Sequence, residues 1–391
     1  AVAHAWAERV ARRKMNRDRF PGLHDGWARL DGPAGSQVLD TSATAVLAYL
    51  SGHDVANLQG PSAASRATED LLADCRTVVA ELLGGQPDGL ILGPSTTVLI
   101  ARFASALGEH LSPGDEIVCT ELDHDANISP WLDLARKTGA TVKLARADPR
   151  TLDLPVAAIS EVLTPRTRVV AMTAASNVTG TQPDLAAIAD AVHANGAVLL
   201  LDAVHAVPHG PAEVAGCHAD AVVCSAYKWF GPHVSALCVR PGLLDTLRPT
   251  RIRPAPAHGP EAWERGALPF ELLPGLAAAA RYVRDVDWAA AERHEGELLA
   301  ALLAGLQDLP RVNLIGSPSR RTSTVAFTVD GLSSAHVAHA LADREIAVGH
   351  GSFYAIELFA RLGLDSGVRA GALHYTDHDD VERLLDAVRH L

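Results

Sequence analysis

Short apolar segments alternate with helix-like segments between residues 89 and 239, and this alternation limits the possible folds more than any other feature. Strands that are apolar throughout are buried on both faces, and helices between successive strands produce parallel pairing. We therefore expect an α/β fold with a mostly parallel, seven-stranded sheet flanked by helices. The expected strands are 89–92, 116–120, 141–144, 168–173, 198–201, 221–225 and 236–239. The helices expected from their periodicity are 66–83, 97–107, 128–137 and 185–194.

A second, smaller unit follows a change of composition around residues 251–260, where Pro, Arg and His accumulate. Beyond it, amphipathic periodicity predicts helices at 274–287, 290–306, 335–343 and 379–391, with strands at 322–329 and 346–348. We expect residues 16–260 to form a large α/β domain. Residues 1–15, which include a short predicted helix within 1–14, and residues 261–391 are expected to form a smaller α+β domain.

The bulk composition limits the classes of partner. The chain has 391 residues, of which 48% are hydrophobic and 20% charged, as is typical of a globular protein. Its formal net charge of −12 disfavours nucleic acids and anionic membranes as partners. No apolar run approaches the roughly 20 residues that span a bilayer, and residues 1–18 lack the apolar core of a secretion signal. We expect a cytoplasmic protein.

The five cysteines predict neither a disulfide framework nor a metal site, because their number is odd and no CxxC pair occurs. Cys119 and Cys224 lie within apolar strand-like segments, where a small buried thiol is the simplest interpretation. This pattern agrees with a reducing compartment.

Polar side chains follow four of the expected strands, at the point where each strand ends. Strand 116–120 leads to Asp123, His124 and Asn127, and strand 168–173 leads to Ser176 and Asn177. The two other strand ends are followed by polar residues as well: Asp202, His205, Ser225 and Lys228. Because open parallel sheets bind ligands beyond the carboxyl ends of their strands, these groups are expected to meet at one edge.

Asp202 and Lys228 give this edge a specific chemistry. A lysine amine in an aromatic setting (Tyr227, Trp229, Phe230) has a lowered pKa and can form a Schiff base with pyridoxal 5′-phosphate (PLP). A carboxylate that follows four apolar residues arrives nearly buried and needs a cation, which the protonated pyridine ring of PLP supplies. The competing interpretation is a lysine whose ammonium reaches water from the strand end.

A phosphate site is expected where residues 93–97, Gly-Pro-Ser-Thr-Thr, join a strand to a helix. Hydroxyl groups and free backbone N–H groups at a helix N-terminus bind phosphate, although Ser and Thr are also ordinary helix caps. His124 likewise has two interpretations, as a solvated loop histidine or as a flat ring that stacks on the cofactor.

These residues resemble fold-type I PLP-dependent enzymes of the class V aminotransferase group, and most closely the cysteine-desulfurase-like branch. The resemblance covers nearly the whole chain. The motifs that carry it are Leu-Asp-His-Asp-Ala-Asn at 122–127, Ala-Ser-Asn-Val-Thr-Gly-Thr at 175–181, Asp-Ala-Val-His at 202–205, Ser-Ala-Tyr-Lys-Trp-Phe-Gly-Pro at 225–232 and Gly-Val-Arg-Ala-Gly at 367–371.

The resemblance assigns a role to each site residue. It implies that Lys228 carries the cofactor, that His124 stacks on its ring and that Asp202 pairs with the pyridine nitrogen. Asn177 and His205 would contact the cofactor or the substrate. The residues implied to hold the phosphate are Thr96, Thr97, Ser225 and Tyr227. Arg369 would bind the substrate α-carboxylate, a bidentate task suited to a guanidinium. The group is usually homodimeric, with active sites at the subunit interface.

One departure from the family pattern bears on the reaction. Desulfurases carry a nucleophilic cysteine 15 residues before the arginine, and counting back from Arg369 gives Tyr354. A phenol cannot accept sulfur as a thiolate does. The leading hypothesis is therefore β-elimination by a C–S lyase that acts on cysteine or an S-substituted cysteine, with a natural-product pathway as one setting for it. Tyr354 or His350 would protonate or enclose the leaving group.

Other outcomes at the same carbon stay open at this point. They are transamination, epimerisation and decarboxylation-coupled oxidative deamination. A PLP-fold protein that has lost catalysis and serves as a partner protein is a further alternative. The intact set Lys228, Asp202, His124 and Arg369 disfavours it.

Overall fold

The computed structural model describes residues 17–391 apart from residue 54. The helix expected within residues 1–14 lies outside the described residues. Among those described, no helix is both long enough and apolar enough to cross a membrane.

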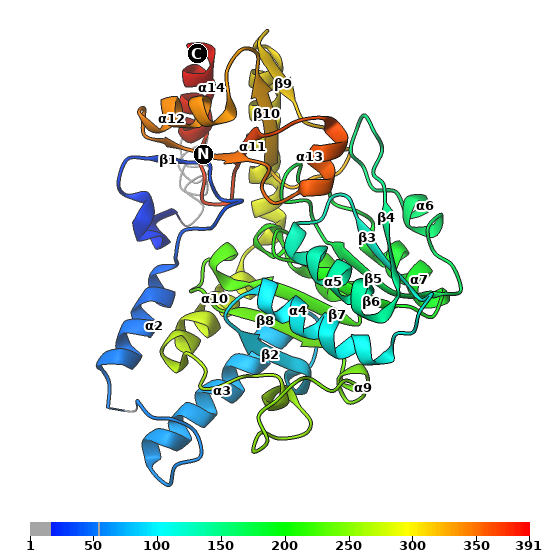
Figure 1. The fold of residues 1–391 in the computed structure, drawn as a ribbon. Helices are drawn as coiled ribbons and strands as arrows, with labels where there is room; N and C mark the ends of the chain where they lie inside the picture. Colours follow the sequence, from blue (N-terminus) through cyan, green and yellow to red (C-terminus); the bar gives the residue numbers. More distant parts are fainter. Residues whose placement is uncertain (1–16, 54) are drawn as a thin grey trace.

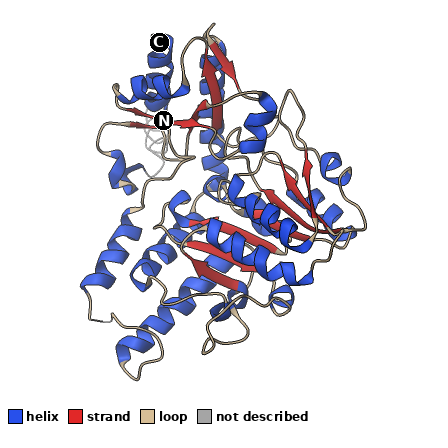
Figure 2. Ribbon diagram, viewed as in Figure 1, coloured by secondary structure: helices blue, strands red, loops and turns tan. Residues whose placement is uncertain are grey.

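A seven-stranded sheet forms the centre of the larger unit, as expected (Figures 1 and 2). Its strand order is β2-β8-β7-β6-β5-β3-β4, and only β8 runs antiparallel to its neighbours. The strands are β2 (Leu90–Gly93), β3 (Glu116–Thr120), β4 (Thr141–Ala145), β5 (Thr167–Thr173), β6 (Val198–Asp202), β7 (Ala221–Ser225) and β8 (Ser235–Val239). Each of the seven predicted strands is confirmed to within one residue at either end.

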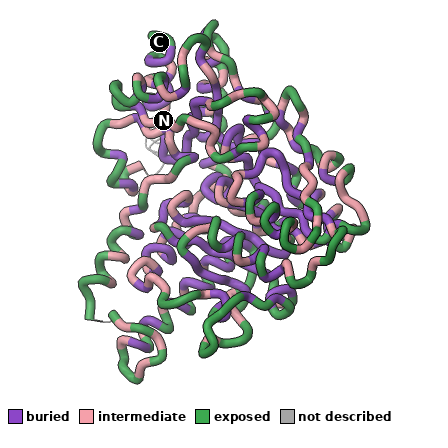
Figure 3. The backbone as a smooth tube through the Cα atoms, in the orientation of Figure 1, coloured by how far each residue is buried: buried purple, intermediate pink, exposed green. Residues whose placement is uncertain are grey.

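Helices cover both faces of this sheet (Figure 2), and its strands are buried (Figure 3), which explains why the strands lack polar alternation. Leu200 of β6 faces a cluster with α4 (Thr96–Leu107) and α5 (Ser129–Thr138). Its neighbours Leu199 and Leu201 point to the other face, into a cluster with the helices α3, α7 and α10. These helices are α3 (Ala63–Leu82), α7 (Leu185–Ala194) and α10 (Leu273–Asp285).

The smaller unit is a four-stranded antiparallel sheet with helices on it (Figure 1). Its strand order is β12-β13-β10-β9, and β1 pairs separately with β11. The elements are β1 (Ala28–Arg29), α11 (Trp288–Gln307), β9 (Val312–Leu314), β10 (Thr324–Val329), α12 (Ser334–Ala342), β11 (Ile346–Ala347), β12 (Gly349–Gly351), β13 (Gly367–Gly371) and α14 (His378–Arg389). The α-helices absent from the expected set are α2 (Asp40–Ser51), α6 (Val156–Ser160), α8 (Ala212–Gly216), α9 (Pro241–Leu244) and α13 (Ile356–Leu362).

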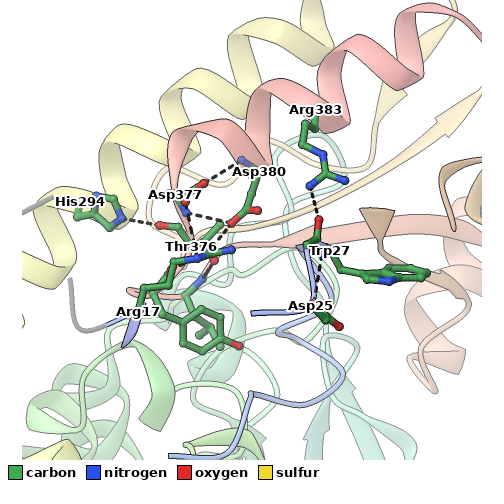
Figure 4. A network of polar contacts seen from close by, with 11 residues as sticks. Arg17, Asp25, Trp27, His294, Thr376, Asp377, Asp380 and Arg383 are labelled. Atoms are coloured by element: carbon green, nitrogen blue, oxygen red, sulfur yellow. Dashed lines mark hydrogen bonds and ion pairs between the residues drawn. The ribbon is translucent and has the colours of Figure 1, made fainter. Parts of the chain in front are cut away.

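Polar contacts attach the N-terminal segment to the smaller unit (Figure 4). Arg17 Nη1 donates to Asp380 Oδ2 over 2.8 Å, at the N-terminus of α14. One helical turn further, Arg383 Nη1 donates to the carbonyl of Gly26 over 2.7 Å. His294 of α11 bonds the carbonyl of Thr376 over 2.7 Å. Residues 17–31 therefore lie with the C-terminal elements.

The domain limits expected at residues 15/16 and 260/261 stay a prediction. Two packing features favour different limits. Strand β1 pairs with β11 of the smaller unit, whereas α10 packs on α2 and on α3 of the larger unit. Gly275 of α10 permits that close approach, since a Cβ there would lie 2.7 Å from Val46 Cγ2. We propose that residues 17–31 and 286–391 form the smaller domain.

Candidate active site

A cavity of about 490 Å³ lies at the carboxyl ends of β3, β5 and β6. Most of its walls come from segments that follow β2, β3, β5, β6 and β7, as the sequence predicted, and Tyr354 comes from the loop between β12 and α13. The lining residues are Thr96, Thr97, His124, Asp125, Ala126, Thr173, Ala175, Asn177, Asp202, Val204, His205, Tyr227, Lys228 and Tyr354.

Lys228 ends a short 3₁₀ turn (Ala226–Lys228) directly after β7, and its amine projects into the cavity. The Nζ atom donates to the carbonyl of Pro33 and lies 5.3 Å from the centre of the Tyr227 ring. Burial, and then the nearby Arg369 charge, lower the pKa of the amine to about 7, against the opposing effect of Asp202. A large fraction of Lys228 is therefore neutral, and nucleophilic, at physiological pH.

Asp202 is the last residue of β6 and is 6% exposed. Its Oδ1 accepts a hydrogen bond from the Val204 N–H over 2.9 Å. Burial raises the pKa of the carboxyl to about 6, although the Val204 N–H and the Lys228 charge both lower it. A buried negative charge is unfavourable unless a cation lies beside it, so the Asp202 carboxylate favours a ligand with a positively charged atom at this position.

His124 lies on the loop after β3, where its Nδ1 accepts a hydrogen bond from the Ala126 N–H over 3.0 Å. Burial, and then the charges of Lys228 and Arg369, lower the pKa of the imidazole to about 4. The ring is therefore neutral at pH 7. Its centre lies 5.0 Å from that of the Tyr354 ring, with a 33° angle between the planes.

The loop between β12 and α13 closes one side of the cavity. The carbonyl of Tyr354 accepts from the Asp125 N–H over 2.7 Å. The carbonyl of Phe353 accepts from Asn177 Nδ2 over 2.8 Å. Both Phe353 and Tyr354 have left-handed backbones, with φ of 54° and 56°, which non-glycine residues adopt only when their surroundings hold them. These contacts fix the 68% exposed Tyr354 at the cavity mouth.

Arg369 of β13 lies against this loop and is buried. Its Nη1 donates to the carbonyl of Asn177 over 2.6 Å, and its guanidinium carbon lies 4.3 Å from the centre of the Phe353 ring. Burial lowers the pKa of Arg369 to about 10, while Asp31 and Tyr227 oppose the shift. Arg369 is therefore a buried positive charge near the cavity, although it is not part of the cavity wall.

The N-terminus of α4 supplies an anion site at the opposite end. Ser95 is the cap residue, since its hydroxyl accepts from the Val98 N–H over 3.2 Å. Thr96 and Thr97 therefore keep their backbone N–H groups and hydroxyls for a ligand, and both residues line the cavity.

Two expected site residues do not reach the cavity. Ser225 is 1% exposed, and its hydroxyl bonds Ser235 Oγ on the paired strand over 2.6 Å. His350 pairs with Val368 in β12 and is exposed on the smaller domain. The phosphate-binding role of Ser225 and the substrate-binding role of His350 stay predictions. His205 lines the cavity, yet its Nε2 bonds Thr324 Oγ1 over 3.0 Å.

Sequence reasoning missed several wall residues, of which Val204 is the most informative. Val204 follows Asp202 by two positions and lines the cavity. The alternation of a strand could not have predicted it, because β6 ends at Asp202 and residues 204–206 form a turn. Thr173 and Ala175, at the end of β5, also line the cavity.

Comparison with known proteins identifies this arrangement. The family model for class V aminotransferases matches residues 28–384. The chain belongs to the class V aminotransferase family. An uncharacterized protein of Mycobacterium tuberculosis is 30% identical over 96% of this chain and 98% of its own length. A probable cysteine desulfurase of Mycobacterium leprae is 33% identical over 80% of this chain and 79% of its own.

Solved structures agree with this assignment. The cysteine desulfurase CsdA from Escherichia coli superposes with a TM-score of 0.88 at 27% identity, over 96% of this chain and 97% of its own. The family and these relatives confirm both the expected fold and the cysteine-desulfurase-like character of the chain.

The residues present fit the family's cofactor, pyridoxal 5′-phosphate. Asn177 Oδ1 is buried and has no hydrogen-bond partner among the described residues, so it is free to accept from a ligand in the cavity. Lys228, Asp202 and the N-terminus of α4 supply an amine, a buried carboxylate and an anion site around one cavity. The cofactor of this enzyme is PLP, which Lys228 would hold at its aldehyde, Asp202 at its ring nitrogen, and Thr96 with Thr97 at its phosphate.

Proposed function

We propose that this enzyme is a C–S lyase that eliminates the β-sulfur of cysteine or an S-substituted cysteine. The observation that carries the proposal is the residue that the loop between β12 and α13 places at the cavity mouth. Tyr354 occupies the place where desulfurases carry their cysteine, and the cavity wall contains no cysteine among the described residues. The five cysteines, all of them described, are free and buried. Sulfur would therefore leave as a small thiol or persulfide.

The protein groups around the cavity suit such an elimination. PLP, when bound, makes the bonds at the substrate Cα labile by withdrawing electrons from them. The Lys228 amine, with its pKa lowered to about 7, is the base that removes the Cα proton. The guanidinium of Arg369 is bonded beside the cavity, to the carbonyl of Asn177, and it would attract the substrate α-carboxylate.

Tyr354 would act on the sulfur side of the Cβ–S bond. Its ring packs on His124, and its exposed phenol faces the mouth through which a bulky sulfur substituent would extend. The phenol would give its proton to the departing sulfur. The Cα–H and Cβ–S bonds are then broken, and the products are a thiol and aminoacrylate, which hydrolyses to pyruvate and ammonia.

The test is product analysis of the PLP-loaded enzyme with a panel of S-substituted cysteines. A lyase yields pyruvate, ammonia and thiol in a 1:1:1 ratio. A keto acid that keeps its sulfur would indicate an aminotransferase, and solvent deuterium at Cα without net product an epimerase. Consumption of O₂ with release of CO₂ would indicate an oxidative deaminase. Any of these three results would replace the proposal, and no turnover at all would favour a non-catalytic partner protein.

A further inference from the structure

A second cavity of about 380 Å³ lies between the large domain and α11 of the smaller domain. Its apolar wall includes Leu185 of α7, Trp288 and Leu299 of α11. A cavity of this volume is within the range that binds small molecules.

This cavity is separate from the active site, although the two share a wall. Ala174 and Ala206 line the second cavity, whereas Thr173, Ala175 and His205 line the first. The two cavities therefore lie on opposite sides of the same chain segments. Thr322, which lines the second cavity, has its hydroxyl 3.4 Å from His205 Nε2.

Glu295 brings a buried carboxylate to this cavity. The residue is 6% exposed, and its Oε2 accepts from Ser323 Oγ over 2.9 Å and pairs with His209 Nδ1 at 2.6 Å. Its Oε1 is buried and has no hydrogen-bond partner among the described residues. A buried carboxylate oxygen without a donor is costly, so the oxygen is poised to accept from a ligand.

Arg321 brings a positive charge to the same cavity. Its Nη2 donates to the carbonyl of Thr324 over 2.6 Å, but its Nε is buried without a partner among the described residues. Burial lowers the pKa of Arg321 to about 10, and no carboxylate among the described residues forms an ion pair with it. The neighbouring Arg320, by contrast, is already paired with Glu213.

We propose that this cavity is a second binding site, which takes a free zwitterionic α-amino acid. Its carboxylate would pair with Arg321, its ammonium would donate to Glu295 Oε1, and its side chain would lie against Trp288 and Leu299. One ligand of this class supplies both a donor for Glu295 Oε1 and a negative charge for Arg321, whereas a simple anion or cation would supply only one of the two. The inference does not depend on which reaction the active site performs.

The test uses a probe that cannot react with an aldehyde. N,N-dimethyl-L-leucine keeps the carboxylate and an N–H⁺ group, but a tertiary amine forms no Schiff base. Isothermal titration of the PLP-loaded enzyme should show one probe bound per chain. Arg321→Gln and Glu295→Gln should each weaken binding at least about tenfold, the loss expected when one charged hydrogen bond of about 1.4 kcal/mol or more is removed.

Matched variants locate the probe. Arg320→Gln removes a guanidinium at the adjacent position that is already paired, and should change the affinity less than about threefold. Arg369→Ala alters the first cavity only and should leave the affinity unchanged. Loss of binding in Arg369→Ala with none in Arg321→Gln would place the probe in the active site and overturn the proposal.

If a variant fails to fold, two analogues of the probe can be tested on the wild-type enzyme instead. The carboxamide of the probe lacks the carboxylate, and the N-acetyl amino acid lacks the ammonium. Both should bind at least about tenfold more weakly than the probe. Equal binding of all three compounds would show that neither charge is recognised, and no binding of the probe at about 10 mM would show that the cavity holds water only. Either result would overturn the proposal.

Discussion

At the scale of single residues, the buried carboxylate of Asp202 should lower the stability of the cofactor-free protein. Burial raises its pKa to about 6, so the folded state binds this proton more tightly than the unfolded state does. The contribution of Asp202 to the unfolding free energy therefore falls as pH rises from about 4 to 6 and is constant above that. This contribution amounts to roughly 3 kcal/mol.

Replacing Asp202 with asparagine should consequently stabilise the cofactor-free protein at pH 7 by about 1–3 kcal/mol, because the amide carries no charge to desolvate. Urea unfolding of the two proteins measures the difference. Asp123→Asn is the matched control. Burial also raises the pKa of Asp123, to about 7, but its two oxygens accept from the Thr120 N–H, the Thr120 hydroxyl and Asn127 Nδ2. Because the nitrogen of an amide accepts none of these bonds, Asp123→Asn should stabilise the protein less than Asp202→Asn does. Destabilisation by Asp202→Asn would contradict the prediction.

Lys228 should react with small electrophiles at a lower pH than other lysines do. With its pKa lowered to about 7, the neutral fraction rises about tenfold between pH 6 and 8 and then levels off. Reductive methylation of the cofactor-free protein with formaldehyde, followed by peptide mass spectrometry, measures this reactivity. Lys137, an exposed residue of α5, is the internal control. A labelling rate of Lys228 that kept climbing through pH 9 would show an ordinary amine.

At the scale of elements, few contacts hold the loop after β12, and a single substitution removes its hydrogen bond with Asn177 Nδ2. Asn177→Ala removes the donor to the Phe353 carbonyl, which a left-handed backbone needs to stay in place. We expect hydrogen exchange of the amides in residues 349–355 to speed up by about tenfold, equivalent to about 1.4 kcal/mol. We also expect KM to rise more than kcat falls, because the mouth of the cavity loosens.

His350→Ala is the control for this loop. Its side chain is exposed on β12 and makes no contact with the cavity, so the variant should leave both exchange and KM unchanged. A strong effect of His350→Ala on KM would restore the substrate-binding role that the sequence suggested for it.

The same elements show what a sequence can and cannot predict. The strands of the large sheet were predictable because burial on both faces leaves an uninterrupted apolar run, as in Val198–Asp202. The strand β12, Gly-His-Gly, carries no such signal, because its place depends on pairing with β13. Ser225 was predicted at the site because it ends a strand, yet its side chain points across the sheet to Ser235. Direction at a strand end is decided by tertiary packing.

At the scale of the whole molecule, the surface of α2 suggests how two chains meet. One side of α2 packs on α10, where Ser42 Oγ donates to the carbonyl of Gly275 over 2.9 Å. Leu47 and Leu50, one turn apart on α2, stay 66% and 57% exposed. Exposed apolar groups of this size mark interaction surfaces. We propose that α2 contacts a second copy of the chain in a homodimer.

Leu47→Glu should therefore dissociate the dimer, because burying a carboxylate at an apolar contact costs several kcal/mol. Light scattering coupled to size exclusion should give twice the chain mass of 41.1 kDa for the wild type and the single-chain mass for the variant. Leu132→Glu changes a 43% exposed leucine on α5, a helix that lies apart from α2, and should stay dimeric (Figure 1). A monomeric wild type would contradict the dimer itself. Dissociation by Leu132→Glu but not by Leu47→Glu would move the contact to α5.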